Sequence, residues 1–127
     1  MKVEEVRSIL NAEWLSRIND RSPFSNVVVL SCHASDLMSD VLTVSREGSL
    51  LLTGLTNAQV IRVAEVSDIV AVCFVRGKRP QEEVIQLAEQ REIPLLGTAL
   101  SMYESCGRLW EKGLRGGGGT GTKDETA

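Results

Sequence analysis

The sequence is poor in aromatic residues, histidine and cysteine, and each scarcity narrows what the protein can be. Aromatic residues make up only 4% of the 127 residues, whereas hydrophobic residues make up 43%. Aliphatic side chains and alanine must therefore build the core. A chain of this length and composition forms a single domain.

The three cysteines, Cys32, Cys73 and Cys106, cannot all pair within one chain, and none forms a Cys-x-x-Cys pair. Because His33 is the only histidine, a structural zinc site is not expected. We predict reduced thiols, a cytoplasmic location, no bound metal and no cofactor.

Long hydrophobic runs and a surplus of basic residues are also missing. The apolar stretches are strand-sized, far short of the roughly 20 residues that a membrane span needs. Acidic residues stand near the N-terminus where a signal peptide would be apolar. The net charge of -3 offers no basic field for a nucleic-acid backbone. Partners among membranes and nucleic acids are therefore not expected.

What the sequence does contain is a repeated alternation of strand-like and helix-like segments. Helical spacing of apolar residues predicts helices at residues 3–10, 35–43, 56–66, 82–91 and 101–112. Short apolar runs predict buried strands at residues 27–30, 49–53, 69–75 and 94–96. Pro80 suits the first turn of a helix, and Ser101 with Glu104 forms a capping box. Four strand–helix repeats predict an α/β fold, a three-layer sandwich with a mostly parallel four-stranded central sheet flanked by helices.

The composition changes abruptly after residue 113. Glycines follow one another at positions 116–119, and residues 123–127 are polar. We therefore place the domain at residues 1–113 and a flexible glycine-rich tail at residues 114–127. A phosphate-binding glycine loop would need a lysine followed by serine or threonine at a helix start, whereas Asp124 follows Lys123.

The turns that follow parallel strands share one edge of the sheet, where such sheets bind ligands. In the turn at 76–80, three cations and a glycine precede a helix, and helix N-termini attract anions. The alternative is a solvated turn whose cations pair with Glu82, Glu83 or a neighbouring carboxylate. The predicted ligand-binding residues at this edge are Ser35, Asp36, Thr56, Asn57, Arg76, Lys78 and Arg79.

Purely structural roles also account for several of these residues. Ser35 and Thr56 suit helix N-caps, and Asp36 suits the positive end of a helix. Metal binding by Asp36 and Asp40 would need further oxygen ligands that the sequence does not assign.

The neighbours Cys32 and His33 do not form a nucleophile–base pair, because adjacent residues of an extended segment point to opposite faces. A serine triad would have to use this same histidine. No catalytic residue is predicted.

Four segments together resemble the DRTGG domain family over about residues 2–111. They are SDLMSDV at 35–41, GKRP at 77–80, IPLL at 93–96 and YESCGRL at 103–109. The motif that names the family is altered here: Asp20 and Arg21 keep its first two positions, and Ser31 and Cys32 stand where the glycine pair would fall. That loss removes the backbone freedom that a glycine pair gives a ligand loop.

The resemblance implies an α/β regulatory module that is often dimeric. Such modules occur beside CBS domains in regulated inorganic pyrophosphatases and ahead of the catalytic part of some phosphotransacetylases, and no catalytic residues are established for the module. For the dimer surface, the sequence offers the apolar residues Trp14, Met38 and Leu42.

The leading hypothesis is a non-catalytic regulatory or ligand-sensing homodimer. Its ligand is a small anion, or a nucleotide such as an adenine nucleotide, at the strand-end loops, and it acts on a partner enzyme. The alternative is a protein–protein adaptor without a small-molecule ligand. A phosphoryl-transfer or hydrolytic enzyme is disfavoured by the lack of a phosphate loop and by the single histidine.

Overall fold

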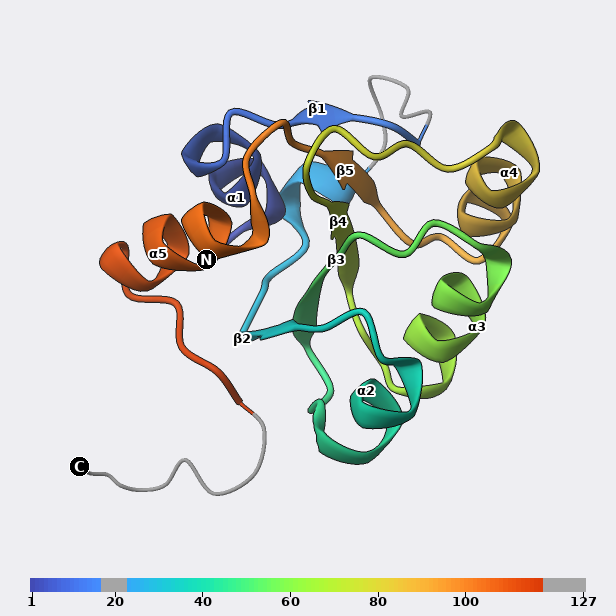
Figure 1. Cartoon of the computed structure of the whole chain (residues 1–127), viewed down its shortest axis with the longest axis horizontal. Helices are drawn as coiled ribbons and strands as arrows, with labels where there is room; N and C mark the ends of the chain where they lie inside the picture. The colour runs from blue at the N-terminus through green and yellow to red at the C-terminus, as the bar shows by residue number, and fades with distance from the viewer. Residues whose placement is uncertain (17–22, 118–127) are drawn as a thin grey trace.

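The computed structural model describes residues 1–16 and 23–117, and a five-stranded mixed sheet lies at the centre of this part (Figure 1). The strands stand in the order β1-β5-β4-β3-β2. β2 to β5 are parallel to one another, while β1 runs antiparallel to β5 with Glu13 opposite Gly97. Their bounds are β1 Glu13–Trp14, β2 Ser31–Ala34, β3 Ser49–Thr53, β4 Ala71–Phe74 and β5 Leu95–Gly97.

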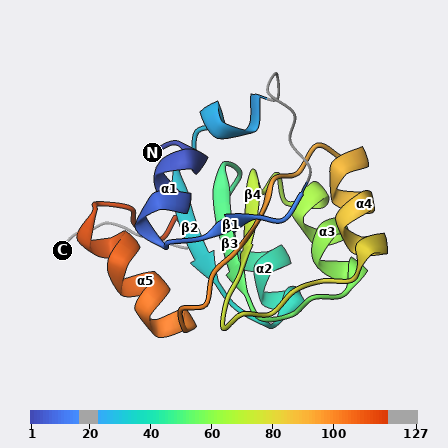
Figure 2. The same cartoon turned by 90° about the horizontal axis from the view of Figure 1, so that it is seen from above.

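Helices cover both faces of the sheet, so the molecule has three layers (Figure 2). The helices α2 (Met38–Val44), α3 (Ala58–Val66) and α4 (Glu82–Gln90) connect successive parallel strands and pack on one face. Right-handed crossovers that all step in the same direction place their helices on the same side. The helices α1 (Val3–Ile9) and α5 (Met102–Glu111) cover the other face, and a 3-10 helix, η1, spans Pro23–Asn26.

The sheet is buried on both faces because neighbouring residues of each strand enter different cores. In β3 and β4, Leu51 and Phe74 pack against the side of α2 to α4, whereas Leu50 and Cys73 pack against α1 and α5. All four are fully buried. Continuous apolar runs are typical of parallel strands covered by helices on both sides, and the predicted α/β class with a mostly parallel sheet is confirmed.

Two details of the predicted sheet are wrong. The sheet of the described residues has a fifth strand, the two-residue β1, and the first parallel strand is Ser31–Ala34 instead of 27–30. The apolar run before β2 is half exposed, with Val28 at 50% and Leu30 at 69%. It pairs with the start of the chain, because Val3 N donates to Val27 O at 2.9 Å and Val29 N to Met1 O at 2.6 Å.

Helix starts also differ from the prediction. Pro80 lies outside α4, whose N-cap is Gln81, and α2 begins at Met38 after the N-cap Leu37, beyond Ser35. The N-cap of α3 is Asn57, one residue after Thr56. The predicted serine cap of the last helix is confirmed, because Ser101 Oγ accepts a hydrogen bond from Glu104 N at 3.1 Å.

The predicted tail and the altered family motif lie largely outside the described residues. Positions 118–127 and the pair Asp20 and Arg21 are not described. Within the described part, Leu114 is buried, and Cys32 N donates to Arg115 O at 3.0 Å along the open edge of β2. None of the helices described is long and apolar enough to cross a membrane.

Candidate functional site

The turns at the carboxyl ends of β4 and β5 diverge to opposite faces of the sheet. The chain leaves β4 toward α4 on one face, and it leaves β5 toward α5 on the other. In open α/β sheets, a crevice forms where adjacent strands send their connections to opposite sides, and ligands bind there. The candidate site is therefore at the β4–β5 divergence, in view in Figure 1.

A pocket of about 420 Å³ lies at this divergence. A volume of this size accommodates a small organic ligand. Three segments line it, namely the approach to β1, the turn after β4 and the turn after β5: Asn11, Ala12, Glu13, Gly77, Lys78, Arg79, Gly97, Thr98 and Ala99. No aromatic side chain is among these lining residues, so the pocket offers no ring on which a base could stack.

Two of the predicted cations, Lys78 and Arg79, border the pocket but differ in their surroundings. Arg79 Nη1 donates to Glu13 Oε2 at 2.7 Å, which ties the turn after β4 to the edge strand β1. Lys78 is exposed and forms no ion pair within the described part of the chain. Lys78 is therefore the cation available to an anionic ligand, whereas Arg79 must leave or share Glu13.

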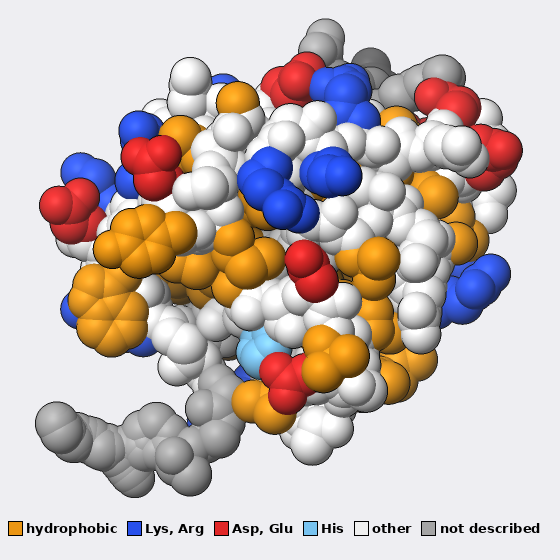
Figure 3. All heavy atoms as spheres, in the orientation of Figure 1, with side chains coloured by type: hydrophobic (Ala, Val, Ile, Leu, Met, Phe, Trp, Pro, Cys, Tyr) orange, Lys and Arg blue, Asp and Glu red, His pale blue; other side chains and the backbone are white. Residues whose placement is uncertain are grey.

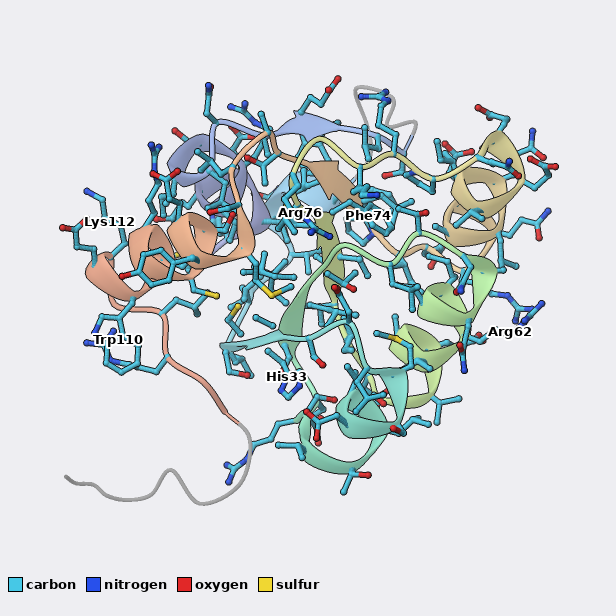
Figure 4. All side chains as sticks on the ribbon, in the orientation of Figure 1. His33, Arg62, Phe74, Arg76, Trp110 and Lys112 are labelled. Carbon is cyan, nitrogen blue, oxygen red and sulfur yellow. The ribbon has the colours of Figure 1, made fainter. Side chains whose placement is uncertain are left out.

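The third predicted cation, Arg76, lies outside this pocket, over the turn that follows β3. Its backbone has φ of 59°, in the left-handed region that non-glycine residues seldom adopt. The bonds from Arg76 N to Leu100 O at 2.8 Å and from Gly77 N to Thr98 O at 2.9 Å hold this conformation. A Cβ atom on Gly54 would collide with Arg76 Nη2. The missing side chain at position 54 is thus what lets the guanidinium lie there (Figure 4).

Asp36 joins two of the turns. Its Oδ1 accepts hydrogen bonds from Gly54 N at 2.7 Å and from Thr53 Oγ1 at 3.0 Å. The carboxylate therefore holds the turn after β2 against the turn after β3, close to the place where Arg76 lies. Figure 3 looks onto this edge, where Lys and Arg side chains gather near the centre beside an acidic group.

The remaining predicted residues make local bonds. Ser35 Oγ accepts from Leu37 N at 3.0 Å, and Asn57 Oδ1 accepts from Gln59 N at 3.1 Å as the cap of α3. Thr56 is half-buried beside them. None of these three residues lines the pocket at the divergence. The seven predicted residues therefore form three groups: Lys78 and Arg79 at the pocket, Arg76 with Asp36, and the turn residues Ser35, Thr56 and Asn57.

The sequence places the turn at 97–101 at the same edge, but none of the predicted site residues comes from that turn or from β1, which also line the pocket. Thr98 is buried; its Oγ1 donates to Leu10 O at 2.7 Å and accepts from Leu100 N at 3.2 Å. It thereby fixes the end of α1 against the turn after β5. The two residues of β1 are too few to give an alternating pattern, and only the sheet order brings Glu13 to this edge.

The histidine and the cysteines lie apart from the pocket. His33 points from β2 toward α2, with Nε2 3.6 Å from Asp40 Oδ2 and without a hydrogen bond, whereas Cys32 packs on the other face with the α1 and α5 core (Figure 4). Burial raises the pKa of Cys32 and of Cys73 to about 12, and it also raises the pKa of Cys106. These thiols are poor nucleophiles. Within the described ranges, no three His, Cys, Asp or Glu side chains are grouped to hold a metal ion.

The fold is that of a DRTGG-like domain, and the DRTGG resemblance drawn from the sequence is confirmed at the level of the fold. The chain is similar to the crystal structure of the CBS and DRTGG domains of the regulatory region of Clostridium perfringens pyrophosphatase, complexed with the activator diadenosine tetraphosphate. The TM-score is 0.63 at 17% sequence identity, covering 85% of this chain and 45% of that one. The chain thus spans less than half of that regulatory region. No family model and no curated protein matches the sequence.

Proposed function

We propose that the protein is a non-catalytic ligand-sensing domain that binds a small phosphate-bearing anion in the pocket at the β4–β5 divergence. The observation that carries this proposal is the pocket itself, which lies where three chain segments meet and is bordered by Lys78 and Arg79. Cations at such a crevice favour phosphate or carboxylate groups. The molecule as a whole has a net charge of -3, so this cationic edge stands against its overall charge.

The character of the lining favours recognition of the phosphate over recognition of a base. Lys78 provides a charge without an ion-pair partner among the described residues, and Arg79 can bind a phosphate with two N–H groups once Glu13 releases it. Apart from these groups, the lining offers small residues such as Ala12, Gly97 and Ala99. A nucleotide is therefore one member of the ligand class, with its phosphates at the cations.

A regulatory role is supported by the similar structure, a regulatory region complexed with the activator diadenosine tetraphosphate. We further propose that the chain works as a homodimer, which is what the family resemblance implies, and that it modulates a partner enzyme.

The test is isothermal titration of the full chain with pyrophosphate, ATP, a diadenosine polyphosphate and phosphate-free adenosine. We expect phosphate-bearing compounds to bind and adenosine not to bind. Lys78→Ala should weaken binding about tenfold, as expected when a charged hydrogen bond is lost, and Arg79→Ala should also weaken it.

Matched controls separate local from general charge effects. Arg62 on α3 and Lys112, the C-cap of α5, are exposed residues of the same types (Figure 4), so Arg62→Ala and Lys112→Ala should bind as the parent does. Equal weakening by Lys78→Ala and Lys112→Ala would refute the site, and absence of binding by every compound in the panel would favour the adaptor hypothesis instead.

A further inference from the structure

The outer face of α5 carries two exposed aromatic side chains in a protein that has few. Tyr103 is 88% exposed and Trp110 is 59% exposed. A shallow groove of about 580 Å³ lies along this face and is lined entirely by α5 residues. Figure 3 shows hydrophobic side chains standing out over α5. Tyrosine and tryptophan are the residues most often found at the centres of protein interfaces.

The order of residues along this face suits close helix packing. Tyr103, Gly107 and Trp110 follow one another at helical spacing, so the glycine lies between the two rings on one stripe. A Cβ atom on Gly107 would have no heavy atom within 4 Å. The middle of the stripe is therefore open, and another helix backbone can approach there more closely than side chains would otherwise permit.

A second stripe beside the first carries alternating charge, with Glu104, Arg108 and Glu111 at the same spacing. Rotation by a two-fold axis that brings two copies of α5 together antiparallel, centred between Cys106 and Gly107, places Tyr103 opposite the partner's Trp110. It also places Glu104 within one residue of the level of the partner's Arg108, an offset of about 1.5 Å along the axis.

We propose that α5 is the contact by which two copies of this chain associate, through an antiparallel α5–α5 pair. Its self-complementary order of aromatic, glycine and charged residues is what an isologous interface requires. This inference rests on the homodimer within the proposed function and names its surface. A helix pair offers fewer residues than the roughly 20–30 a side of a standard interface, so the dissociation constant falls in the micromolar range.

The test is sedimentation velocity of the full chain from about 1 to 300 µM, a range that brackets the affinity expected of a small interface. Glu104→Arg and Arg108→Glu should each raise the dissociation constant at least tenfold, because each places equal charges opposite one another. The double variant re-forms the pair with its charges exchanged, and it should recover to within about threefold of the parent. Glu83→Arg and Arg62→Glu, reversals at exposed residues of α4 and α3, serve as controls and should leave association unchanged.

A second readout follows Trp110 directly. The chain has two tryptophans, so a Trp14→Phe background leaves Trp110 as the reporter, and its emission should shift to shorter wavelength as the concentration rises through the dissociation constant. Dimers with unchanged affinity in both single variants would overturn the α5 assignment while leaving the homodimer intact. Failure of the double variant to recover would likewise overturn the pairing. A monomer at every concentration would overturn the homodimer together with this surface, and the ligand titrations stand or fall separately.

Discussion

At the scale of single residues, the edge of the sheet depends on a glycine that makes room for an arginine. Gly54 does not have a positive φ, so its backbone conformation does not require glycine. Glycine matters at this position because a Cβ atom would occupy the space where Arg76 Nη2 lies. Arg76 itself has a left-handed backbone conformation. Backbone strain of this kind is often found at functional sites. The neighbouring carboxylate of Asp36 is engaged by Thr53 and Gly54.

Gly54→Ala tests whether this placement matters, because it moves the guanidinium without changing the charge of the protein. We expect the variant to fold with little loss of stability and to bind pyrophosphate about threefold more weakly, the size of an exposed charge interaction. Arg76→Ala should have the same effect, and the two changes together should not add. Titration calorimetry measures all three. Binding as tight as that of the parent in both single variants would exclude Arg76 from the ligand site.

The buried thiols make the stability of the protein depend on alkaline pH. The pKa of Cys32 and of Cys73 is raised from 9.0 to about 12, because burial disfavours the thiolate. The folded state therefore holds protons that the unfolded state releases, and the free energy of unfolding falls as the pH rises from about 9 toward 12. The upper bound is roughly 4 kcal/mol for each thiol, from 1.36 kcal/mol per pKa unit.

Urea unfolding at pH 7.5, 9 and 10.5 measures this slope, and Cys73→Ala, which has no thiol to ionise, should flatten it. A free energy of unfolding that stays constant over this range would contradict the burial of both thiols. In the folded protein, Cys32 and Cys106 are both partly exposed. Cys106 should react first with a thiol reagent, because burial raises the pKa of Cys32 to about 12.

At this scale, the sequence predicted which residues lie near the edge of the sheet. It said little about how their side chains are arranged there. Lys78 and Arg79 border the pocket because a turn after a parallel strand must lie at that edge. The direction of Arg76 could not be predicted, since nothing in the local sequence signals a left-handed arginine. The ion pair of Arg79 with Glu13, 66 positions away in the chain, depends on the sheet order.

At the scale of elements, the helix and strand patterns were accurate except that β1 was missed, β2 was placed too early, and helix starts were misplaced where a polar residue could serve two positions. Thr56 and Asn57 both suit an N-cap, and the structure uses Asn57, whose Oδ1 accepts from Gln59 N at 3.1 Å. The start of α2 was misplaced in the same way. The predicted helix began at Ser35, but the side chain of Ser35 caps a turn before α2, which begins at Met38. Met38, proposed for a dimer surface, is 4% exposed and packs in the core, whereas Leu42 is 50% exposed.

The cap of α3 gives a prediction about stability. Asn57→Ala should lower the free energy of unfolding by about 1 kcal/mol, because a backbone N–H at the start of the helix loses its acceptor. Thr56→Ala should lower it by less than about 0.5 kcal/mol, as for most surface changes. Chemical denaturation compares the two. A larger loss for Thr56→Ala would mean that the threonine caps the helix in solution.

At the scale of the whole molecule, the site follows from the way the chain changes sides. Three crossovers place α2, α3 and α4 on one face, and the chain after β5 passes to the other face to form α5. A sequence of strand and helix patterns predicts the layers, but not which face the last helix covers. The sequence therefore could not predict the crevice between β4 and β5, nor that β1 helps to close it.

The ion pair between Glu13 and Arg79 makes β1 a competitor of the ligand at this crevice. An anion that engages Arg79 must displace a carboxylate 2.7 Å away, which costs part of the binding free energy. Glu13→Gln should therefore bind pyrophosphate about threefold more tightly, the size of an exposed ion pair, and salt should weaken the effect. Glu65→Gln, which breaks the exposed ion pair of Glu65 with Arg91, removes the same charge away from the pocket and should leave affinity unchanged. Titrations at two salt concentrations measure this difference.

If Glu13→Gln binds more weakly than the parent, the carboxylate itself holds the ligand, and the ligand then carries a hydrogen-bond donor at that point. The ion pair joins β1 to the turn after β4. Tighter binding in Glu13→Gln would therefore also mean that ligand binding loosens this edge of the sheet. Such loosening would carry the effect of the ligand from the pocket to any partner that contacts the edge.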